Sequence, residues 1–305
     1  MAIKKKKQSG SSIREARAGW LLAGPWLISL VVLTGIPIVA TVVFSFTDLG
    51  VASTPDFIAF DHYATILGND PVFWTALGNT AYYTLISVPM RLALAFGLAL
   101  LLNSNLRGIR AYQTLFYLPA MVPPVAATAV FMLLLTPGAG PVNLILETVG
   151  ISAPDWTRDP DWAIWTLILL SLWPLGVEAL VFLAALREVP PEVQDAAKLD
   201  ASRRWERMWF ITIPLITPAI LFNLVIGIIN SFQVFTQAMV IGGTTGKPSE
   251  STLMLLVLIY RTAFRYFNMG YAAALSVLLL ILLAAMTALI FLTSRRWVHY
   301  EGGFR

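Results

Sequence analysis

The chain has 305 residues, of which 57% are apolar and 12% are charged, and its net charge at pH 7 is +4. An ordinary soluble domain is about 45–50% apolar and about 25% charged, so the composition predicts a membrane protein. The chain contains no cysteine, which excludes a disulfide framework, a thiolate metal site and a cysteine nucleophile. Its two histidines, His62 and His299, lie far apart in the sequence, and we expect each to be solvated or interfacial.

A helix needs roughly 20 apolar residues to cross the hydrocarbon core of a bilayer. Three uncharged runs reach that length, at residues 20–46, 115–135 and 271–292. Three further runs are interrupted by a charge or by prolines, at residues 77–102, 163–186 and 209–229. The interruptions are Arg91, Glu178, and the pair Pro214 and Pro218. Neighbouring helices can satisfy the carbonyl that a proline frees, so we expect an all-α bundle of six transmembrane helices.

The basic residues predict the orientation of this bundle. Sixteen of the 21 Lys and Arg residues lie in the two terminal tails and in the loops at 103–114 and 187–208, whereas the opposite loops hold four. By the positive-inside rule, the basic side faces the cytoplasm. We therefore expect cytoplasmic tails at 1–19 and 295–305 around one transmembrane domain at 20–294. Anionic lipid headgroups account for the net positive charge, and we expect no nucleic-acid partner.

A glycine-rich segment at residues 242–248 superficially resembles a phosphate-binding loop. Its spacing fails, because Ile241 stands five residues before Gly246 and Pro248 follows Lys247. We therefore expect a flexible turn here and no bound cofactor. Any ATP must then be bound by a partner subunit, and the chain itself is expected to have no catalytic residues.

The loop at 187–208 carries the strongest functional signal. Pro191 followed by Glu192 is a favourable start for a helix. Val193, Ala196 and Ala197 then offer an apolar surface with small side chains, which a partner could approach closely. On composition alone, the alternative is an amphipathic helix that lies on the lipid headgroups.

Three short motifs in and after this loop resemble a family signature. They are Asp195-Ala196-Ala197, Asp200-Ala201 and Ile211-Thr212-Ile213-Pro214. They are similar to the E-A-A, D-G and I-x-L-P signature of permease subunits in binding-protein-dependent ABC importers, particularly the maltose and glycerol-phosphate branch. Asp195 stands where the family usually has Glu, and Ala201 stands where it usually has Gly.

The resemblance implies a type I importer permease in the inner or cytoplasmic membrane, with the 187–208 loop as a coupling helix. The residues that would contact the ATPase are Asp195, Ala196, Ala197, Asp200, Ala201, Arg203 and Arg204. The resemblance also implies the partners: a second permease subunit of different sequence, two ATPase subunits and an extracytoplasmic solute-binding protein. The chain would then be a translocation subunit for carbohydrate and not an enzyme.

A path for an uncharged sugar needs polar and aromatic side chains around a cavity. The fifth predicted span and its continuation offer Asn223, Asn230, Ser231, Gln233 and Gln237. Asn223, Asn230 and Gln237 recur every seven residues, so they would share one face of a continuous helix. The alternative is polar contact between helices. The resemblance favours the substrate path, because sugar-importer permeases bind substrate in this part of the chain.

Arg91 and Glu178 are costly in hydrocarbon, so we expect them to face the bundle interior or to reach an interface. A pair that contains an arginine is a poor proton relay, and a structural or cavity-lining role is the expectation. Tyr82, Tyr83 and Trp173 are expected mainly to pack between helices or to lie at the membrane interface. The alternative is that they line the cavity.

Two alternative functions remain open on the sequence. A self-sufficient secondary transporter of a small polar solute would need an ion site and would gain nothing from a docking loop. An intramembrane enzyme would need a nucleophile with a base, or a metal cluster, and we find neither pattern.

Overall fold

The computed structural model describes residues 10–50, 54–104, 107–190, 192–193 and 203–299. Within these residues the secondary structure is helical, with two isolated β-bridges and no strand. The first elements, in which η marks 3₁₀ or π-helical turns, are α1 (Gly10–Ser29), η1 (Leu30–Gly35), α2 (Ile36–Phe44), α3 (Asp61–Asn69), α4 (Pro71–Leu102), α5 (Ile109–Tyr117), η2 (Leu118–Met121), α6 (Pro124–Leu134) and α7 (Pro141–Thr148). The remaining elements are α8 (Pro160–Ser171), α9 (Gly176–Glu188), α11 (Arg204–Arg207), η3 (Met208–Thr212), α12 (Ile213–Leu215), α13 (Thr217–Phe232), α14 (Thr236–Gly242), η4 (Gly243–Thr245), α15 (Leu255–Tyr260), η5 (Arg261–Arg265) and α16 (Met269–Ser294).

The helices provide up to six membrane spans. Four helical stretches are each long and apolar enough to cross a bilayer: Ala18–Phe44, Pro71–Leu102, Thr217–Thr245 and Met269–Ser294. Two bent helix pairs, α5 to α6 and α8 to α9, bring the number to six if each pair forms one span. The expected all-α, multi-span fold is confirmed.

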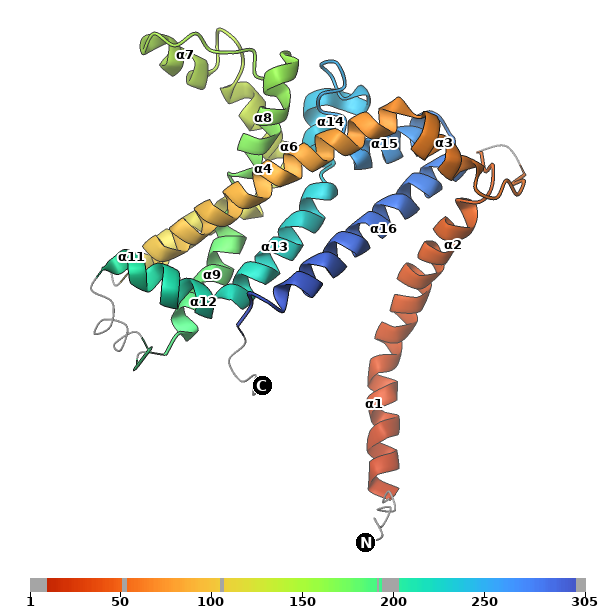
Figure 1. Cartoon of the computed structure of the whole chain (residues 1–305), viewed down its shortest axis with the longest axis horizontal. Coiled ribbons are helices and arrows are strands. Elements are labelled where there is room, and N and C mark those ends of the chain that lie inside the picture. The colour runs from red at the N-terminus through yellow and green to blue at the C-terminus, as the bar shows by residue number, and fades with distance from the viewer. Residues whose placement is uncertain (1–9, 51–53, 105–106, 191, 194–202, 300–305) are drawn as a thin grey trace.

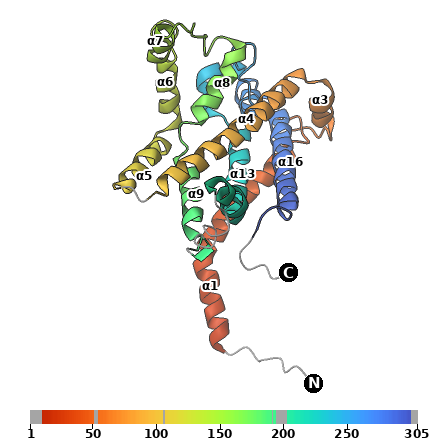
Figure 2. The same cartoon turned by 60° about the vertical axis from the view of Figure 1, so that its left-hand side comes forward.

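The first span stands apart from the other helices. α2 packs against α16, whereas α1 extends away from the bundle (Figures 1 and 2). None of the most apolar window of this span is buried among the described residues. In a membrane these side chains face lipid or another subunit.

The two ends of the bundle carry different loops. α5, α11 and the end of α16 lie toward one end, and α3, α7 and α14 lie toward the other (Figures 1 and 2). The described parts of the basic loops at α5 and α11 therefore share one side with the end of α16, as alternating spans require. That this side is the cytoplasmic one stays a prediction.

Two of the predicted spans are broken. The run predicted at 115–135 turns by 96° between η2 and α6, and the run predicted at 163–186 bends by 46° between α8 and α9. Pro123 and Pro174 lie in these breaks. A proline cannot donate a backbone hydrogen bond inside a helix, so each of these two runs is a pair of helices joined at a bend and not one continuous helix.

The fifth span begins at Thr217 and not at Trp209. The chain before it forms η3 and α12, and Pro214 and Pro218 stand in the first turns of α12 and α13. A proline is well suited to the first turn of a helix, because a backbone N–H at that position would have no acceptor within the helix. The prolines therefore start helices here and do not interrupt one.

Two buried clusters hold the bundle together. The larger cluster joins α3, α4, α8, α14, α15 and α16. The smaller cluster joins α4 to α9 through Ala95, Ala99, Ala179 and Phe182. Small residues let helix backbones approach closely, which favours helix association in lipid.

The expectation that His62 is solvated was wrong, whereas an interfacial position stays a prediction. His62 is 7% exposed, its Nε2 lies 3.1 Å from the backbone oxygen of Thr47, and its ring packs edge-on against Tyr271. The ring is enclosed because α3 packs against the start of α16. His299 is exposed, as expected.

We expect Gly176→Ala to destabilise the protein. A Cβ at this position would lie 2.5 Å from the backbone oxygen of Phe116 and 2.7 Å from the Cα atom of Tyr117. Neither atom can move without separating α5 from α9, so the expected cost is roughly 1–3 kcal/mol. Thermal unfolding in detergent, followed by tryptophan fluorescence, measures the effect.

Gly97→Ala is the matched control for this substitution. Outside the neighbouring turns of its own helix, no described atom lies within 4 Å of a Cβ built at Gly97, and alanine is the better helix former. The melting temperature of this variant should therefore stay the same or rise slightly. A melting temperature for Gly176→Ala as high as that of Gly97→Ala would contradict the packing described here.

Candidate functional site

A cavity of about 280 Å³ lies where the broken helices meet. Its walls come from α4, from the turn before α6, from the break between α8 and α9, and from the break between α13 and α14. The polar and aromatic residues that line it are Tyr83, Arg91, Thr128, Ser171, Trp173, Asn230, Ser231, Gln233, Phe235, Thr236 and Gln237. Irregular backbone is tolerated within a membrane where it lines a cavity or is buried in protein. The cavity therefore accounts for breaks in three different spans.

Four of the five residues predicted for the substrate path line this cavity. Asn230 and Ser231 lie at the end of α13, Gln233 lies in the following break and Gln237 lies on α14. The Ser231 hydroxyl oxygen is buried and has no hydrogen-bond partner in the described part of the chain. These groups could hydrogen-bond a polar solute, and their contact with a substrate stays a prediction.

Asn223 lies outside the cavity. It is 3% exposed, and its Nδ2 donates a hydrogen bond to the backbone oxygen of Glu178 at 3.2 Å. The expected continuous helix from Asn223 through Asn230 to Gln237 was wrong, because residues 233–235 separate α13 from α14. Asn223 instead makes the contact between helices that was the alternative.

Arg91 and Glu178 form an ion pair between α4 and α9. Nη2 of Arg91 bonds Oε1 of Glu178, and the side chains are 18% and 15% exposed. Arg91 also lines the cavity. Among the described residues of the lining, it is the one that carries a charge. Oε2 of Glu178 is buried, and no described group bonds it. Both residues thus face the bundle interior, which is one of the two placements expected.

The aromatic residues divide between two roles. Tyr83 and Trp173 line the cavity, which was the alternative for both, and Tyr83 also packs in the larger buried cluster, as expected. Tyr82 is 42% exposed and meets the Trp165 ring edge-on, with 6.3 Å between the ring centroids. No sequence pattern indicated Thr128 or Ser171, because the breaks before α6 and after α8 bring these residues to the cavity.

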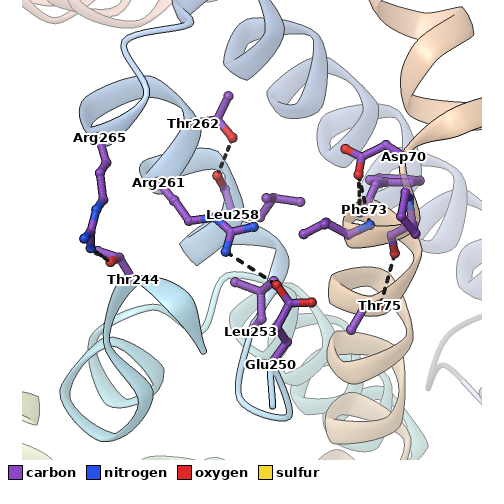
Figure 3. A network of polar contacts seen from close by, with 12 residues as sticks. Asp70, Phe73, Thr75, Thr244, Glu250, Leu253, Leu258, Arg261, Thr262 and Arg265 are labelled. Carbon is purple, nitrogen blue, oxygen red and sulfur yellow. Dashed lines mark hydrogen bonds and ion pairs between the residues drawn. The ribbon is translucent and has the colours of Figure 1, made fainter. Parts of the chain in front are cut away.

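A second polar cluster holds the turn at 242–248, which was expected to be flexible (Figure 3). Nη1 of Arg261 lies 3.7 Å from Oε1 of Glu250, and Arg265 donates to the Thr244 hydroxyl. Arg261 is buried beneath this turn, with 6% of its surface exposed. The segment therefore contacts η5 through Thr244, and its expected flexibility stays a prediction.

Most of the predicted ATPase-docking residues lie outside the described residues, namely Asp195, Ala196, Ala197, Asp200 and Ala201. Arg203 is exposed, and Arg204 begins α11. Trp205 and Trp209 follow, with their rings edge-on at 5.6 Å and both half-exposed or more. The docking role of the loop stays a prediction.

Residues 91–299 match the family described as the inner membrane component of binding-protein-dependent transport systems. The chain is 37% identical to the probable ABC transporter permease protein YesP of Bacillus subtilis (strain 168), over 97% of this chain and 96% of YesP. It is 32% identical to the lactose transport system permease protein LacF of Rhizobium radiobacter, over 91% of this chain and 94% of LacF.

The fold is similar to that of a solved structure, a bacterial alginate ABC transporter in complex with an alginate pentasaccharide-bound periplasmic protein. The TM-score is 0.82 at 23% sequence identity, over 94% of this chain and 96% of that chain. The resemblance drawn from the loop motifs is thereby confirmed, and a secondary transporter or an intramembrane enzyme no longer fits. The chain belongs to the family of inner membrane components of binding-protein-dependent transport systems, as a multi-pass ABC importer permease.

Proposed function

We propose that the chain forms half of the translocation path of an ATP-driven carbohydrate importer. A second permease subunit of different sequence would complete the path, two ATPase subunits would supply the energy, and an extracytoplasmic binding protein would deliver the sugar. Full-length similarity to a lactose permease supports carbohydrate as the cargo class.

The single observation that carries this proposal is the chemistry of the cavity. Amide and hydroxyl groups from Asn230, Ser231, Gln233 and Gln237 surround a space that also contacts the rings of Tyr83, Trp173 and Phe235. The hydroxyl groups of a sugar can hydrogen-bond the amides and hydroxyls, and the apolar faces of its ring can stack on the aromatic rings. The volume of about 280 Å³ lies near the lower end of ligand pockets, about 300–1,000 Å³.

The 187–208 loop would transmit the movement of the ATPase to this cavity. α9 leads into the loop, and α12 and α13 follow it. Asn223 ties α13 to the backbone of Glu178 on α9, and Glu178 in turn bonds Arg91 at the cavity. A docked loop that moved as a rigid body would therefore carry α9 and α13 together.

The last described residue, His299, contacts the start of α13. The backbone N–H of His299 donates to the Thr217 hydroxyl at 2.9 Å, and the same hydroxyl donates to the backbone oxygen of Pro214. The last described residues are thus attached to the start of α13, beside the predicted docking loop.

We expect Ala196→Arg to abolish co-purification of the ATPase with this chain, because a long cation would replace a small side chain at the centre of the docking surface. Affinity purification of the complete importer from membranes measures the ATPase recovered. Ala139→Arg is the matched control, since Ala139 is an exposed alanine between α6 and α7, at the opposite end of the bundle. Sugar uptake that continues without any ATPase would contradict the proposal.

Orientation can be tested directly because the natural chain has no cysteine. Ala111, in the first turn of α5, and Ala139, between α6 and α7, are both exposed and are predicted to face opposite sides of the membrane. We expect a membrane-impermeant thiol reagent to label Ala139→Cys in intact cells or spheroplasts, and to label Ala111→Cys only after permeabilisation. The reverse pattern would overturn the predicted cytoplasmic termini.

A further inference from the structure

We propose that Arg91 contacts the transported solute directly, and that its ion pair with Glu178 restricts this chain's part of the path to uncharged saccharides. The inference rests on the proposed function and deepens it by naming the charge class of the cargo. It follows from where the charges of the pair lie relative to the cavity.

Arg91 keeps hydrogen-bond donors for a ligand. A guanidinium has five N–H donors and no acceptor. Among the described residues, Arg91 donates to one acceptor, Oε1 of Glu178. Because Arg91 lines the cavity, its other donors are open to the oxygen atoms of a solute. The planar fork of donors suits two neighbouring hydroxyl groups of a sugar ring.

The compensating charge stands behind Arg91. Glu178 is absent from the described lining of the cavity, and Arg91 is the one charged residue in that lining. The solute therefore meets an arginine whose charge is already neutralised. A uronate would lose hydration on entering such a site without gaining a net opposite charge. A neutral sugar gains the same hydrogen bonds and has no charge to desolvate.

Glu178 acts as a positioning residue for Arg91. Its backbone oxygen is fixed by Asn223, and no described residue bonds its Oε2. The pair is thus not part of a larger charge network within the described chain. A neutral substitution at Glu178 should leave the charge of Arg91 uncompensated and exposed to the cavity.

The test measures equilibrium binding to the complete importer, purified in detergent without its binding protein. The probes are matched pairs that differ at C6, namely glucose and glucuronate, galactose and galacturonate, and digalactose and digalacturonate. The wild-type complex should bind the neutral member of a pair more tightly. Glu178→Gln should raise the affinity ratio of uronate to neutral sugar by at least about tenfold, because an unpaired cation then faces the carboxylate.

Two further variants separate charge from hydrogen bonding. Arg91→Lys keeps the charge and loses the planar fork, so the affinity for the neutral sugar should fall while the ratio stays near that of the wild type. The double variant Arg91→Gln with Glu178→Gln has no charge at the pair. It should keep the wild-type preference at reduced affinity, and it provides the readout if Glu178→Gln alone fails to assemble.

Glu250→Gln is the matched control. It removes the carboxylate of another ion pair, with Arg261, which lies outside the cavity. The ratio of affinities should not change in this variant.

The remaining outcomes distinguish failure of the Arg91 inference from failure of the proposed carbohydrate function. If sugars bind and neither Glu178→Gln nor the double variant behaves as stated, this inference fails while the proposed function stands. If the wild-type complex binds uronates more tightly than neutral sugars, the inference likewise fails and the proposed function stands. If the wild-type complex binds no member of any pair, the proposed carbohydrate function fails together with the inference.

Discussion

The ion pair between Arg91 and Glu178 constrains the arrangement of the helices around the cavity. A charge inside the membrane is costly unless it is paired or reaches water. This requirement fixes the register of α4 against α9, where the alanines of the smaller core cluster allow close approach. Asn223 extends the same constraint to α13 through the backbone of Glu178. The three spans are therefore joined beside the cavity by polar contacts.

The cavity itself depends on helices that do not run straight. The turn before α6, the break between α8 and α9 and the break between α13 and α14 all contribute to its lining. Proline supplies two of these interruptions, at Pro123 and Pro174. Around them, side-chain amides and hydroxyls face a space within an otherwise apolar bundle. This combination of irregular backbone and polar lining is what a polar solute needs to cross the membrane through protein.

Hydropathy predicted the first and last spans well because each is uniformly apolar and largely exposed to lipid or to other subunits. It could not distinguish a proline that starts a helix, as Pro218 does, from one that breaks a span, as Pro174 does, because neighbouring helices decide between them. Asn223 and Asn230 have the same side chain and a helical spacing, yet one joins two helices and the other lines the cavity. The family was predictable because short loop motifs carry it independently of packing.

A cryo-EM structure of the complete importer with ATP, and with its sugar trapped in the permease pair, tests most directly whether this cavity is the translocation path. We predict ordered sugar density in the cavity, within hydrogen-bond distance of the Arg91 guanidinium and of Asn230, Gln233 or Gln237, with the 187–208 loop seated on an ATPase subunit. Sugar held elsewhere in the permease pair, out of reach of these four side chains, would contradict it.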